Sequence, residues 1–422
     1  MSSTSSPPPR AHEPPAPLPV SVTKERRRPG GWPGAALVAA AFAVTMLGTT
    51  LPTPLYPAYA ARLGFDELMT TVIFAVYAVG VVVGLLLFGH WSDQLGRRPM
   101  LIAGLLLSAL SAAAFLMPSA VGWLFVGRLL SGLSAGIFTG TATATVVDLA
   151  PRSARGRASL LAAAVNMGGL GLGPVLAGVL AQYAPHPLRL CFVVDLILIA
   201  VGAAAVLAIH EPVARRADPS LRPRRLQVPA AARPAFTRAT IVGIAGFAVL
   251  GLFTAVSPAF LGEVLHHHNA ALVGVVVLLV FGASVAGQAG AAVAAARAMP
   301  LGCAGLVVGM VVIAVGLPAH SLPLLLVGGV FAGVGQGMSF RAGLGEVSVA
   351  APDELRGEVT STFFVVCYVG ISLPVIGVGA LATATSLVAA GVTFAVLVAA
   401  LAVVALLLIR RAPAGLPAAT RG

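Results

Sequence analysis

The sequence reads Gly89-His90-Trp91-Ser92-Asp93-Gln94-Leu95-Gly96-Arg97-Arg98-Pro99 between two long apolar runs. Gly96 permits a tight turn, because glycine adopts backbone conformations that other residues avoid. Asp93 and Arg97 carry opposite charges four positions apart, so their side chains can pair across the turn. Arg98 is expected to contact lipid phosphates. We therefore predict a short charged turn that holds two membrane-spanning helices close together.

The composition places the rest of the chain in a membrane as well. Of the 422 residues, 58% are hydrophobic and 9% are charged, whereas about 25% of a soluble protein is charged. This excludes a soluble enzyme, a nucleic-acid-binding domain and a disordered protein. The net charge of +12 comes from Arg clusters between apolar runs, so anionic lipid is the expected partner. The only lysine, Lys24, does not follow a Gly-rich loop, which argues against a P-loop for ATP.

The apolar runs predict an all-α membrane protein with twelve spans, because a helix needs about 20 apolar residues to cross the hydrocarbon. The first six spans are expected near 34–57, 69–90, 99–117, 120–148, 158–182 and 189–209. The other six are expected near 239–262, 270–293, 299–317, 321–347, 358–382 and 386–409.

Two six-helix bundles with polar segments around them follow from this pattern. Residues 1–33 are rich in Ser and Pro and predict a disordered tail. The bundles should occupy residues 34–209 and 239–410. An Arg- and Pro-rich linker, 210–238, separates them, and residues 411–422 form a second tail.

The distribution of basic residues predicts the orientation. If the N-terminus is cytoplasmic, 22 Arg and Lys residues lie inside and only Arg62 and Arg189 lie outside. Cytoplasmic loops carry the excess of basic residues in membrane proteins. Both termini, the linker and the Gly89–Pro99 loop are therefore expected on the cytoplasmic side of the cell membrane.

The two halves repeat each other at a constant offset of 201 residues. This offset relates Pro57 to Pro258, Ala150-Pro151 to Ala351-Pro352, and Arg155-Gly156 to Arg356-Gly357. Glycines recur in the same way: Gly89, Gly104, Gly127, Gly132, Gly136 and Gly178 match Gly290, Gly305, Gly328, Gly333, Gly337 and Gly379. Parallel repeats of six spans are typical of transporters whose halves rock around a site between them.

With these features, the sequence resembles the major facilitator superfamily. Its loop signature, Gly-x-x-x-Asp-x-x-Gly-Arg-Arg/Lys, matches at Gly89, Asp93, Gly96, Arg97 and Arg98, whereas Gln94 stands where the family often has Arg. The resemblance implies alternating access, with the loop controlling the conformational switch. The alternative is a plain positively charged turn, which needs neither the aspartate nor the glycine spacing. In the second half Asp93 maps to Ala294, so the repeat of the loop lacks this charge.

Asp148 lies at the end of the fourth span, just before Ala150-Pro151. In relatives of this type an acid there joins the loop aspartate and arginine, so the resemblance groups Asp148 with Asp93 and Arg97. Three charges at one helix junction can hold an outward-open state and release it on rearrangement. The alternative is a solvated carboxylate at the membrane interface, because charges near helix ends cost little.

Arg128 lies inside the fourth span, in the segment Arg128-Leu129-Leu130-Ser131-Gly132, which resembles the family's Arg-x-x-x-Gly motif. Helical spacing places it on one face with small residues. A buried arginine in a span is a functional hypothesis by default. We assign Arg128 to the wall of a substrate cavity. The alternative is a structural arginine that caps carbonyls or reaches the interface.

The fifth span carries Gly169-Leu170-Gly171-Leu172-Gly173-Pro174-Val175-Leu176-Ala177-Gly178, which is similar to the Gly-Pro motif of the superfamily's antiporters. Pro174 interrupts the helical hydrogen bonds and Gly169, Gly173 and Gly178 permit close packing, so the helix can bend. This motif favours export over uptake. Ordinary tight packing is the alternative.

Three further polar residues, Asp195, Gln336 and Arg341, lie inside predicted spans and are candidates for the substrate or proton cavity. For Asp195, a structural or water-linked carboxylate is the favoured alternative, because the sixth helix is usually peripheral in this superfamily. His266-His267-His268 follow the seventh span. A solvated loop accounts for them better than a metal site or a pH sensor.

The sequence therefore predicts a secondary transporter that exports a small amphipathic compound in exchange for protons. The expected partners are this small-molecule substrate, protons and the bilayer, with no cofactor, metal, ATP or nucleic acid. An uptake symporter for an organic acid is the alternative within transport. A non-transporting membrane sensor or scaffold is the alternative outside it. No cluster of catalytic groups points to an enzyme.

Overall fold

The computed structural model describes residues 31–117, 119–213 and 225–411, and within these residues the chain is helical without strands. The predicted all-α membrane class is confirmed, because the long helices are apolar enough to cross a bilayer. In the first half they are α1 Gly31–Thr50, α3 Glu67–Phe88, α5 Arg97–Phe115, α6 Val121–Leu149, α7 Arg155–Tyr183 and α8 Leu190–Ala208. In the second half they are α9 Arg233–Ala255, α11 Ala270–Ala294, α12 Ala298–Gly316, α13 Leu322–Ala350, α14 Arg356–Ala384 and α15 Leu387–Arg411.

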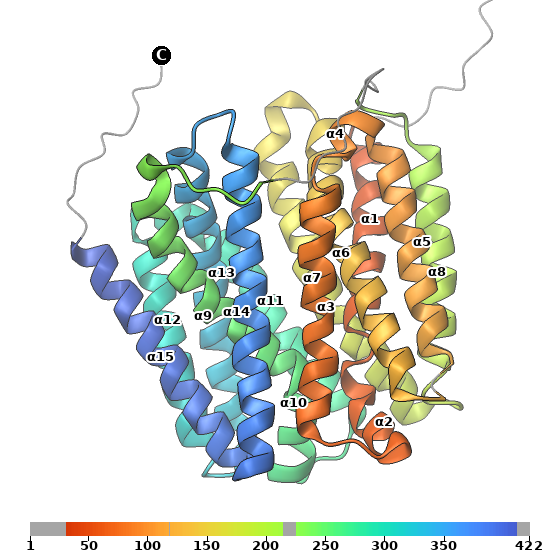
Figure 1. The fold of residues 1–422 in the computed structure, drawn as a ribbon, viewed down its shortest axis with the longest axis vertical. Helices are drawn as coiled ribbons and strands as arrows, with labels where there is room; N and C mark the ends of the chain where they lie inside the picture. The colour runs from red at the N-terminus through yellow and green to blue at the C-terminus, as the bar shows by residue number, and fades with distance from the viewer. Residues whose placement is uncertain (1–30, 118, 214–224, 412–422) are drawn as a thin grey trace, which may run out of the picture.

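Short helices mark the two faces at which the long helices end (Figure 1). One face carries α4 Ser92–Leu95, η2 Arg152–Ala154, η3 Ala230–Ala232 and η5 Ala295–Arg297, and is called the α4 face. The opposite face, called the α2 face, carries η1 Thr53–Leu55, α2 Tyr56–Leu63, α10 Ser257–Ala259 and the π-helix η4 Phe260–Val264.

Polar caps begin three helices at the α2 face. Asp66 accepts a hydrogen bond from the backbone of Met69 at 2.9 Å and caps α3. Asn269 and Ser321 cap α11 and α13 in the same way. Each cap satisfies a backbone N–H that the first turn of a helix cannot satisfy.

The helix ends differ from the sequence prediction at two proline-rich places. The first span was expected near 34–57, but α1 begins at Gly31 and ends at Thr50. Pro52 and Pro54 interrupt the helical hydrogen bonds there, and the chain continues as η1 from Thr53. The seventh span was expected near 239–262, but α9 begins at Arg233 and ends at Ala255, before α10 and η4. The predicted tails and linker lie partly outside the described residues, at 1–30, 214–224 and 412–422.

Equivalent glycines of the repeat make equivalent helix contacts in the two halves. A Cβ at Gly132 or Gly136 of α6 would collide with the backbone of α3 near Gly80 and Gly84. Gly333 and Gly337, at the offset of 201, press in the same way against α11 at Val280 and Ser284. Small residues therefore bring α6 onto α3 and α13 onto α11.

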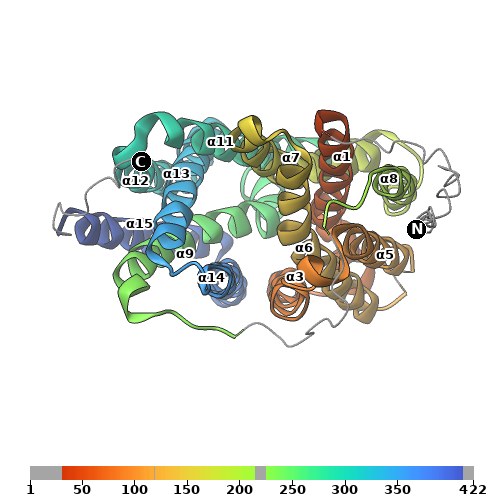
Figure 2. The same cartoon turned by 90° about the horizontal axis from the view of Figure 1, so that it is seen from above.

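The two halves meet along two helix pairs, α7 with α11 and α3 with α14 (Figure 2). The closest contacts at glycines lie toward the α2 face. A Cβ at Gly178 of α7 would collide with Ala270 at the start of α11, and one at Gly379 of α14 would collide with Thr71 of α3. The halves are thus packed tightly together near the α2 face.

Candidate functional site

A cavity of about 770 Å³ lies between the halves. Its residues come from both: from α3, α6 and α7 on one side, and from α9, α11, α13 and α14 on the other. It reaches the α4 ends of the helices, because Gly89, Asp148 and Ser348 line it. Toward the α2 face it ends near Thr50, Phe74 and Ile371.

Aromatic rings from both halves form one wall of this cavity. Tyr77 of α3 meets Tyr368 of α14 edge to face, with ring centroids 6.4 Å apart. Tyr368 continues to Phe247 at 5.6 Å, and Phe247 to Phe340 at 5.5 Å. Phe364 follows at 6.0 Å from Phe340. All five residues line the cavity, so a flat aromatic molecule would find rings to pack on.

Arg341 of α13 is a cavity-lining arginine. It lies nine residues before Ala350, the end of α13, which corresponds to a depth of about 14 Å at 1.5 Å per residue. No ion pair or hydrogen bond joins it to the described residues, whereas Glu346, one turn further, lies 3.4 Å from Arg238. A guanidinium at this depth is suited to an anionic group of a bound molecule.

Gln336 belongs to a polar chain behind the same wall. Ser284 of α11 donates a hydrogen bond to Oε1 of Gln336 at 2.5 Å. Gln288 donates to Ser284 at 3.5 Å, which is a long hydrogen bond. Gln336 is 1% exposed and does not line the cavity, while Gln288 does. Of these three side chains, Gln288 is thus the one that faces the cavity.

The structure brings the three predicted charges of the switch loop together. Arg97 Nη1 lies 2.6 Å from the Asp93 carboxylate, and Nη2 lies 3.2 Å from Asp148. Nη1 also donates to the Ser92 hydroxyl at 2.7 Å. The side chain of Arg97 is 11% exposed, against 53% for Asp93. Arg97 therefore joins α4, α5 and the end of α6 from a largely buried position.

Glu211 completes this junction and was missed in the sequence. Its Oε1 accepts from the backbone N–H of Arg97 at 2.8 Å, and its Oε2 accepts from that of Arg98 at 3.0 Å. A carboxylate at a helix N-terminus satisfies free N–H groups and favours the helix dipole. Its only signal was an acid just after the sixth span, in a linker with a large excess of Arg. The set Ser92, Asp93, Arg97, Asp148 and Glu211 is called the switch network below.

The loop glycines and Arg98 have distinct roles. Gly96 has φ +102°, a conformation that side chains rarely adopt, so the tight turn depends on glycine. Gly89 ends α3 and lines the cavity. Arg98 was expected to face lipid phosphates, but Nε and Nη2 donate to the carbonyls of Val206 and Leu207 at 3.3 and 2.7 Å. It does so because the last carbonyls of α8 have no helical donor.

Arg128 lies behind the cavity wall instead of in it. It is 1% exposed and is absent from the residues that line the cavity. Its Nε donates to the Tyr56 hydroxyl at 2.6 Å and its Nη1 to the Thr49 carbonyl at 2.5 Å. The guanidinium also lies 5.8 Å from the Phe74 ring, which lines the cavity. The predicted cavity position is therefore corrected: Phe74 separates Arg128 from the cavity in this conformation.

Asp195 is also buried outside the cavity. It is 2% exposed on α8 and faces Gly48 of α1, where a Cβ would lie 2.9 Å from its Oδ2. Its Oδ1 has no hydrogen-bond partner among the described residues. Arg128 contacts the adjoining residue of α1, Thr49, from α6. Asp195 and Arg128, both in the described part of the chain, form no ion pair with each other. Asp195 reaches α1 from α8, whereas Arg128 reaches it from α6.

The Gly-Pro motif lies where α7 touches both α1 and the second half. The hydroxyl of Thr50 donates to the carbonyl of Leu170 at 2.8 Å. A Cβ at Gly169 would collide with Ala43 and Met46 of α1, and one at Gly173 would collide with Leu47 and Thr50. Gly178 faces α11 instead. The motif thus holds α7 close to two helices.

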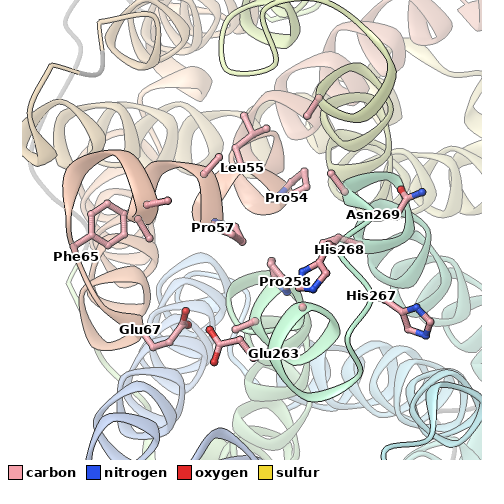
Figure 3. A pocket seen from close by; sticks show the side chains of 18 of the residues that line it. Pro54, Leu55, Pro57, Phe65, Glu67, Pro258, Glu263, His267, His268 and Asn269 are labelled. Carbon is pink, nitrogen blue, oxygen red and sulfur yellow. The ribbon is translucent and has the colours of Figure 1, made fainter.

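The three adjacent histidines lie at the α2 face and are exposed. His267 and His268 line a second cavity, of about 860 Å³, with Pro57, Pro258 and Asn269. In this cavity the carboxylates of Glu67 and Glu263 face each other from opposite halves (Figure 3). Among the described residues none lines both cavities, and the close α7–α11 and α3–α14 contacts lie toward the α2 face.

Curated relatives of the chain include bacterial drug-resistance proteins. It is 36% identical to the class E tetracycline resistance protein of Escherichia coli over 111 residues. This aligned segment covers 26% of this chain and 27% of that protein. Over 170 residues it is 28% identical to multidrug resistance protein 1 of Bacillus subtilis, 40% of this chain and 43% of that protein. The quinolone resistance protein NorA of Staphylococcus aureus is 26% identical over 166 residues, 39% and 42% of the two chains. The chain thus spans less than half the length of these relatives.

Solved structures share the fold along nearly the whole chain. An inward-facing bacterial homologue of the human lysosomal transporter Spinster aligns with a TM-score of 0.71 at 13% identity, over 89% of this chain and 96% of that one. The human organic anion transporter MFSD10 (TETRAN) aligns with a TM-score of 0.63 at 18% identity, over 89% and 99%. The family model of the Major Facilitator Superfamily matches residues 38–375. With twelve long helices in the described residues and a cavity between two related halves, the chain is a multi-pass membrane protein that belongs to the Major Facilitator Superfamily.

Proposed function

We propose that this protein is a proton-coupled exporter of small aromatic compounds that carry an acidic group. One observation carries the proposal: the cavity between the halves reaches the α4 face, ends before the α2 face, and combines aromatic rings with Arg341, which has no ion-pair partner among the described residues. A cavity that opens to one face at a time is the requirement for alternating access.

The lining of the cavity supports this class of cargo. Tyr77, Phe247, Phe340 and Tyr368 offer ring faces and edges to a planar molecule. Arg341 offers a guanidinium that pairs with carboxylates in two parallel hydrogen bonds. Gln288 adds an amide. Hydroxyl and amide side chains such as Thr139, Ser159 and Asn166 also line the cavity. The aromatic rings and the guanidinium together fit an amphipathic aromatic acid.

The distribution of the basic residues supports an orientation in the membrane. Arg97, Arg98, Arg152 and Arg297 all lie at the α4 face, and basic residues accumulate on the cytoplasmic side. We therefore place the α4 face and both termini in the cytoplasm, in the cell membrane. In this orientation the cavity is open to the cytoplasm and takes up its cargo there.

The switch network has a mechanical role in this cycle. It ties α4, α5 and the end of α6 to Glu211, which follows α8. When the cavity closes at the α4 face, these elements move together as one body, because charge-assisted hydrogen bonds to the largely buried Arg97 join them. Loss of the network would leave the helices in the membrane but uncouple their movement.

Export is favoured over uptake by two features together. Relatives are named as tetracycline, multidrug and quinolone resistance proteins, and the Gly-Pro motif of α7 is similar to that of the superfamily's antiporters. Uptake of an organic acid by symport is the second candidate function, because Arg341 would serve either direction.

Drug accumulation in cells that lack their own exporters tests the proposal. Tetracycline and norfloxacin are suitable probes, since both are aromatic and acidic. Cells that express the protein should accumulate less of at least one probe than cells with an empty vector. R341A should abolish the difference and R341K should retain part of it. Equal accumulation with and without the protein, for both probes, would contradict the proposed export of this class of compound.

A further inference from the structure

Pro174 creates a free carbonyl inside α7. Proline has no backbone N–H, so the carbonyl of Leu170, four residues earlier, loses its helical donor. The Thr50 hydroxyl, from the last residue of α1, donates to this carbonyl at 2.8 Å. A second acceptor, the carbonyl of Leu47 in α1 itself, lies 3.3 Å away. Because a hydroxyl has one hydrogen, the two carbonyls compete for it.

The surrounding residues are shaped for this contact. A Cβ at Gly173 would collide with the Leu47 carbonyl and with the Thr50 hydroxyl, so a larger residue would push α1 away from α7. Thr50 is 5% exposed, and both Thr50 and Leu170 line the edge of the cavity. The bond therefore lies between the cavity and the tightly packed contacts near the α2 face.

The same turn of α7 touches the second half on its other side. A Cβ at Gly274 of α11 would lie 2.5 Å from the carbonyl of Pro174. One and two turns further on, Gly178 packs on Ala270, and Gln182 accepts from the Ala270 backbone at 3.0 Å. These contacts must break if the α2 face is to open between α7 and α11. We expect such a movement to bend α7 at the turn 170–174, where Pro174 interrupts the helical hydrogen bonds.

We propose that Thr50 is a positioning residue for this opening, an inference that rests on the proposed alternating access. Its hydroxyl replaces the hydrogen bond that Pro174 removes, and so holds the turn 170–174 in the geometry in which the α2 face is closed. When α7 moves away from α11, the hydroxyl transfers to the Leu47 carbonyl. The bond thus stabilises the state that is open at the α4 face.

Spin labels across the α2 face test this inference without any cargo. Pro185 and His267 are exposed on opposite halves and are replaced by cysteine for labelling, while the native Cys191, Cys303 and Cys367 are buried. T50V keeps the shape of the side chain but loses the donor. It should raise the population with long label distances by several-fold, up to about tenfold, the effect of one net hydrogen bond. T50S should match the wild type.

A matched control comes from the same helix. Thr45 is buried in α1 and donates to the Ala41 carbonyl at 3.0 Å, within its own helix. T45V should therefore leave the distance distribution unchanged. A wild-type distribution in T50V, or the same shift in T50S or T45V, would overturn the role of the Thr50 hydroxyl.

Pro174 supplies the decisive second variant. P174A restores an N–H that donates to the Leu170 carbonyl, so the Thr50 hydroxyl is no longer needed there. T50V in the P174A background should then have no effect on the distances. If T50V alone fails to fold, T50V/P174A should fold, and an unrescued double variant contradicts the inference. If T50V shifts the distances as expected but the wild type shows no gradient-driven transport, the proposed function is contradicted and the role of Thr50 is not.

Discussion

Tyr77 of α3 and Tyr368 of α14 meet edge to face across the two halves, with ring centroids 6.4 Å apart. Both residues line the cavity, so this pair joins the halves and offers a surface to a ligand at the same place. The two helices converge further at the α2 face, where Gly379 packs on Thr71. A bound aromatic molecule at the pair would therefore contact both moving parts of the protein.

Replacement of Tyr368 should separate the effect of the ring from that of the hydroxyl. Y368A removes a ring that also packs on Phe247, and should weaken binding of an aromatic probe about 2- to 10-fold, since an aromatic pair contributes about 0.5–1.5 kcal/mol. Y368F should bind nearly as well as the wild type. Fluorescence titration of the purified protein with norfloxacin measures both, and equal affinities in all three proteins would exclude the ring from the binding surface.

Arg341 should decide the charge preference of the cavity. R341A should lower the affinity for an acidic aromatic probe by about tenfold or more, because a charge-assisted hydrogen bond contributes about 1.5–3 kcal/mol. R341K should retain part of the affinity through its charge alone. Isothermal titration with the acidic probe and with its methyl ester checks this. A loss of the same size for the ester would show that the effect is not electrostatic.

Asp93 should affect movement without affecting insertion. D93N removes the ion pair with Arg97, while Arg97 keeps its contact with Asp148 at 3.2 Å. We expect normal amounts in the membrane and transport reduced about tenfold, because the switch network no longer moves as one charged unit. Initial rates in proteoliposomes, at equal protein content, give the comparison. Wild-type rates in D93N would indicate that the loop serves as an orientation anchor.

Glu211 should contribute to the stability of the first half. E211Q keeps one acceptor but removes the charge at the start of α5, where two backbone N–H groups point at the carboxylate. The expected loss is about 1 kcal/mol, the usual effect of a capping or helix-dipole interaction. Thermal unfolding in detergent measures it. E346Q is the control, since among the described residues Glu346 has only the 3.4 Å contact with Arg238. An equal loss in both variants would contradict a specific role for Glu211.

Arg128 should be a structural residue of the first half more than a ligand for cargo. R128A leaves the Tyr56 hydroxyl and the Thr49 carbonyl without this donor, and should lower the free energy of unfolding by about 2–4 kcal/mol. R128K lacks the planar guanidinium that reaches both acceptors, so it should lose part of the stability. Thermal unfolding and probe titration together decide the matter. If R128A keeps full stability but no longer binds the probe, Arg128 takes part in binding at the cavity.

The fold and the switch loop could be predicted from the sequence because both depend on local patterns. Runs of about 20 apolar residues define spans wherever they occur, and Asp93 and Arg97 pair across a turn that Gly96 permits. The repeat at 201 residues is also present in the structure, since Gly132 packs on α3 and Gly333 packs on the equivalent helix α11. Proline-rich ends such as Pro52–Pro54 shortened α1, which the hydropathy alone did not indicate.

The site was harder to predict because it depends on contacts between distant helices. Arg128 and Asp195 are intramembrane charges, yet their environment is set by α1, which lies next to both α6 and α8. Glu211 and Thr50 act through backbone groups more than 100 residues away in the chain. No periodicity marks such residues. Arg341 was recognisable because an arginine inside a span needs an unusual environment, and the cavity provides it.

The central claim is that cargo leaves in exchange for protons, and flux into proteoliposomes under an imposed pH gradient tests it most directly. Liposomes with an acidic lumen should accumulate the aromatic acid only when they contain the protein, because protons that leave the lumen drive the cargo in. Passive partition of a weak acid would favour an alkaline lumen instead. Accumulation that depends on the protein and occurs only with an alkaline lumen would show symport and contradict the proposed exchange.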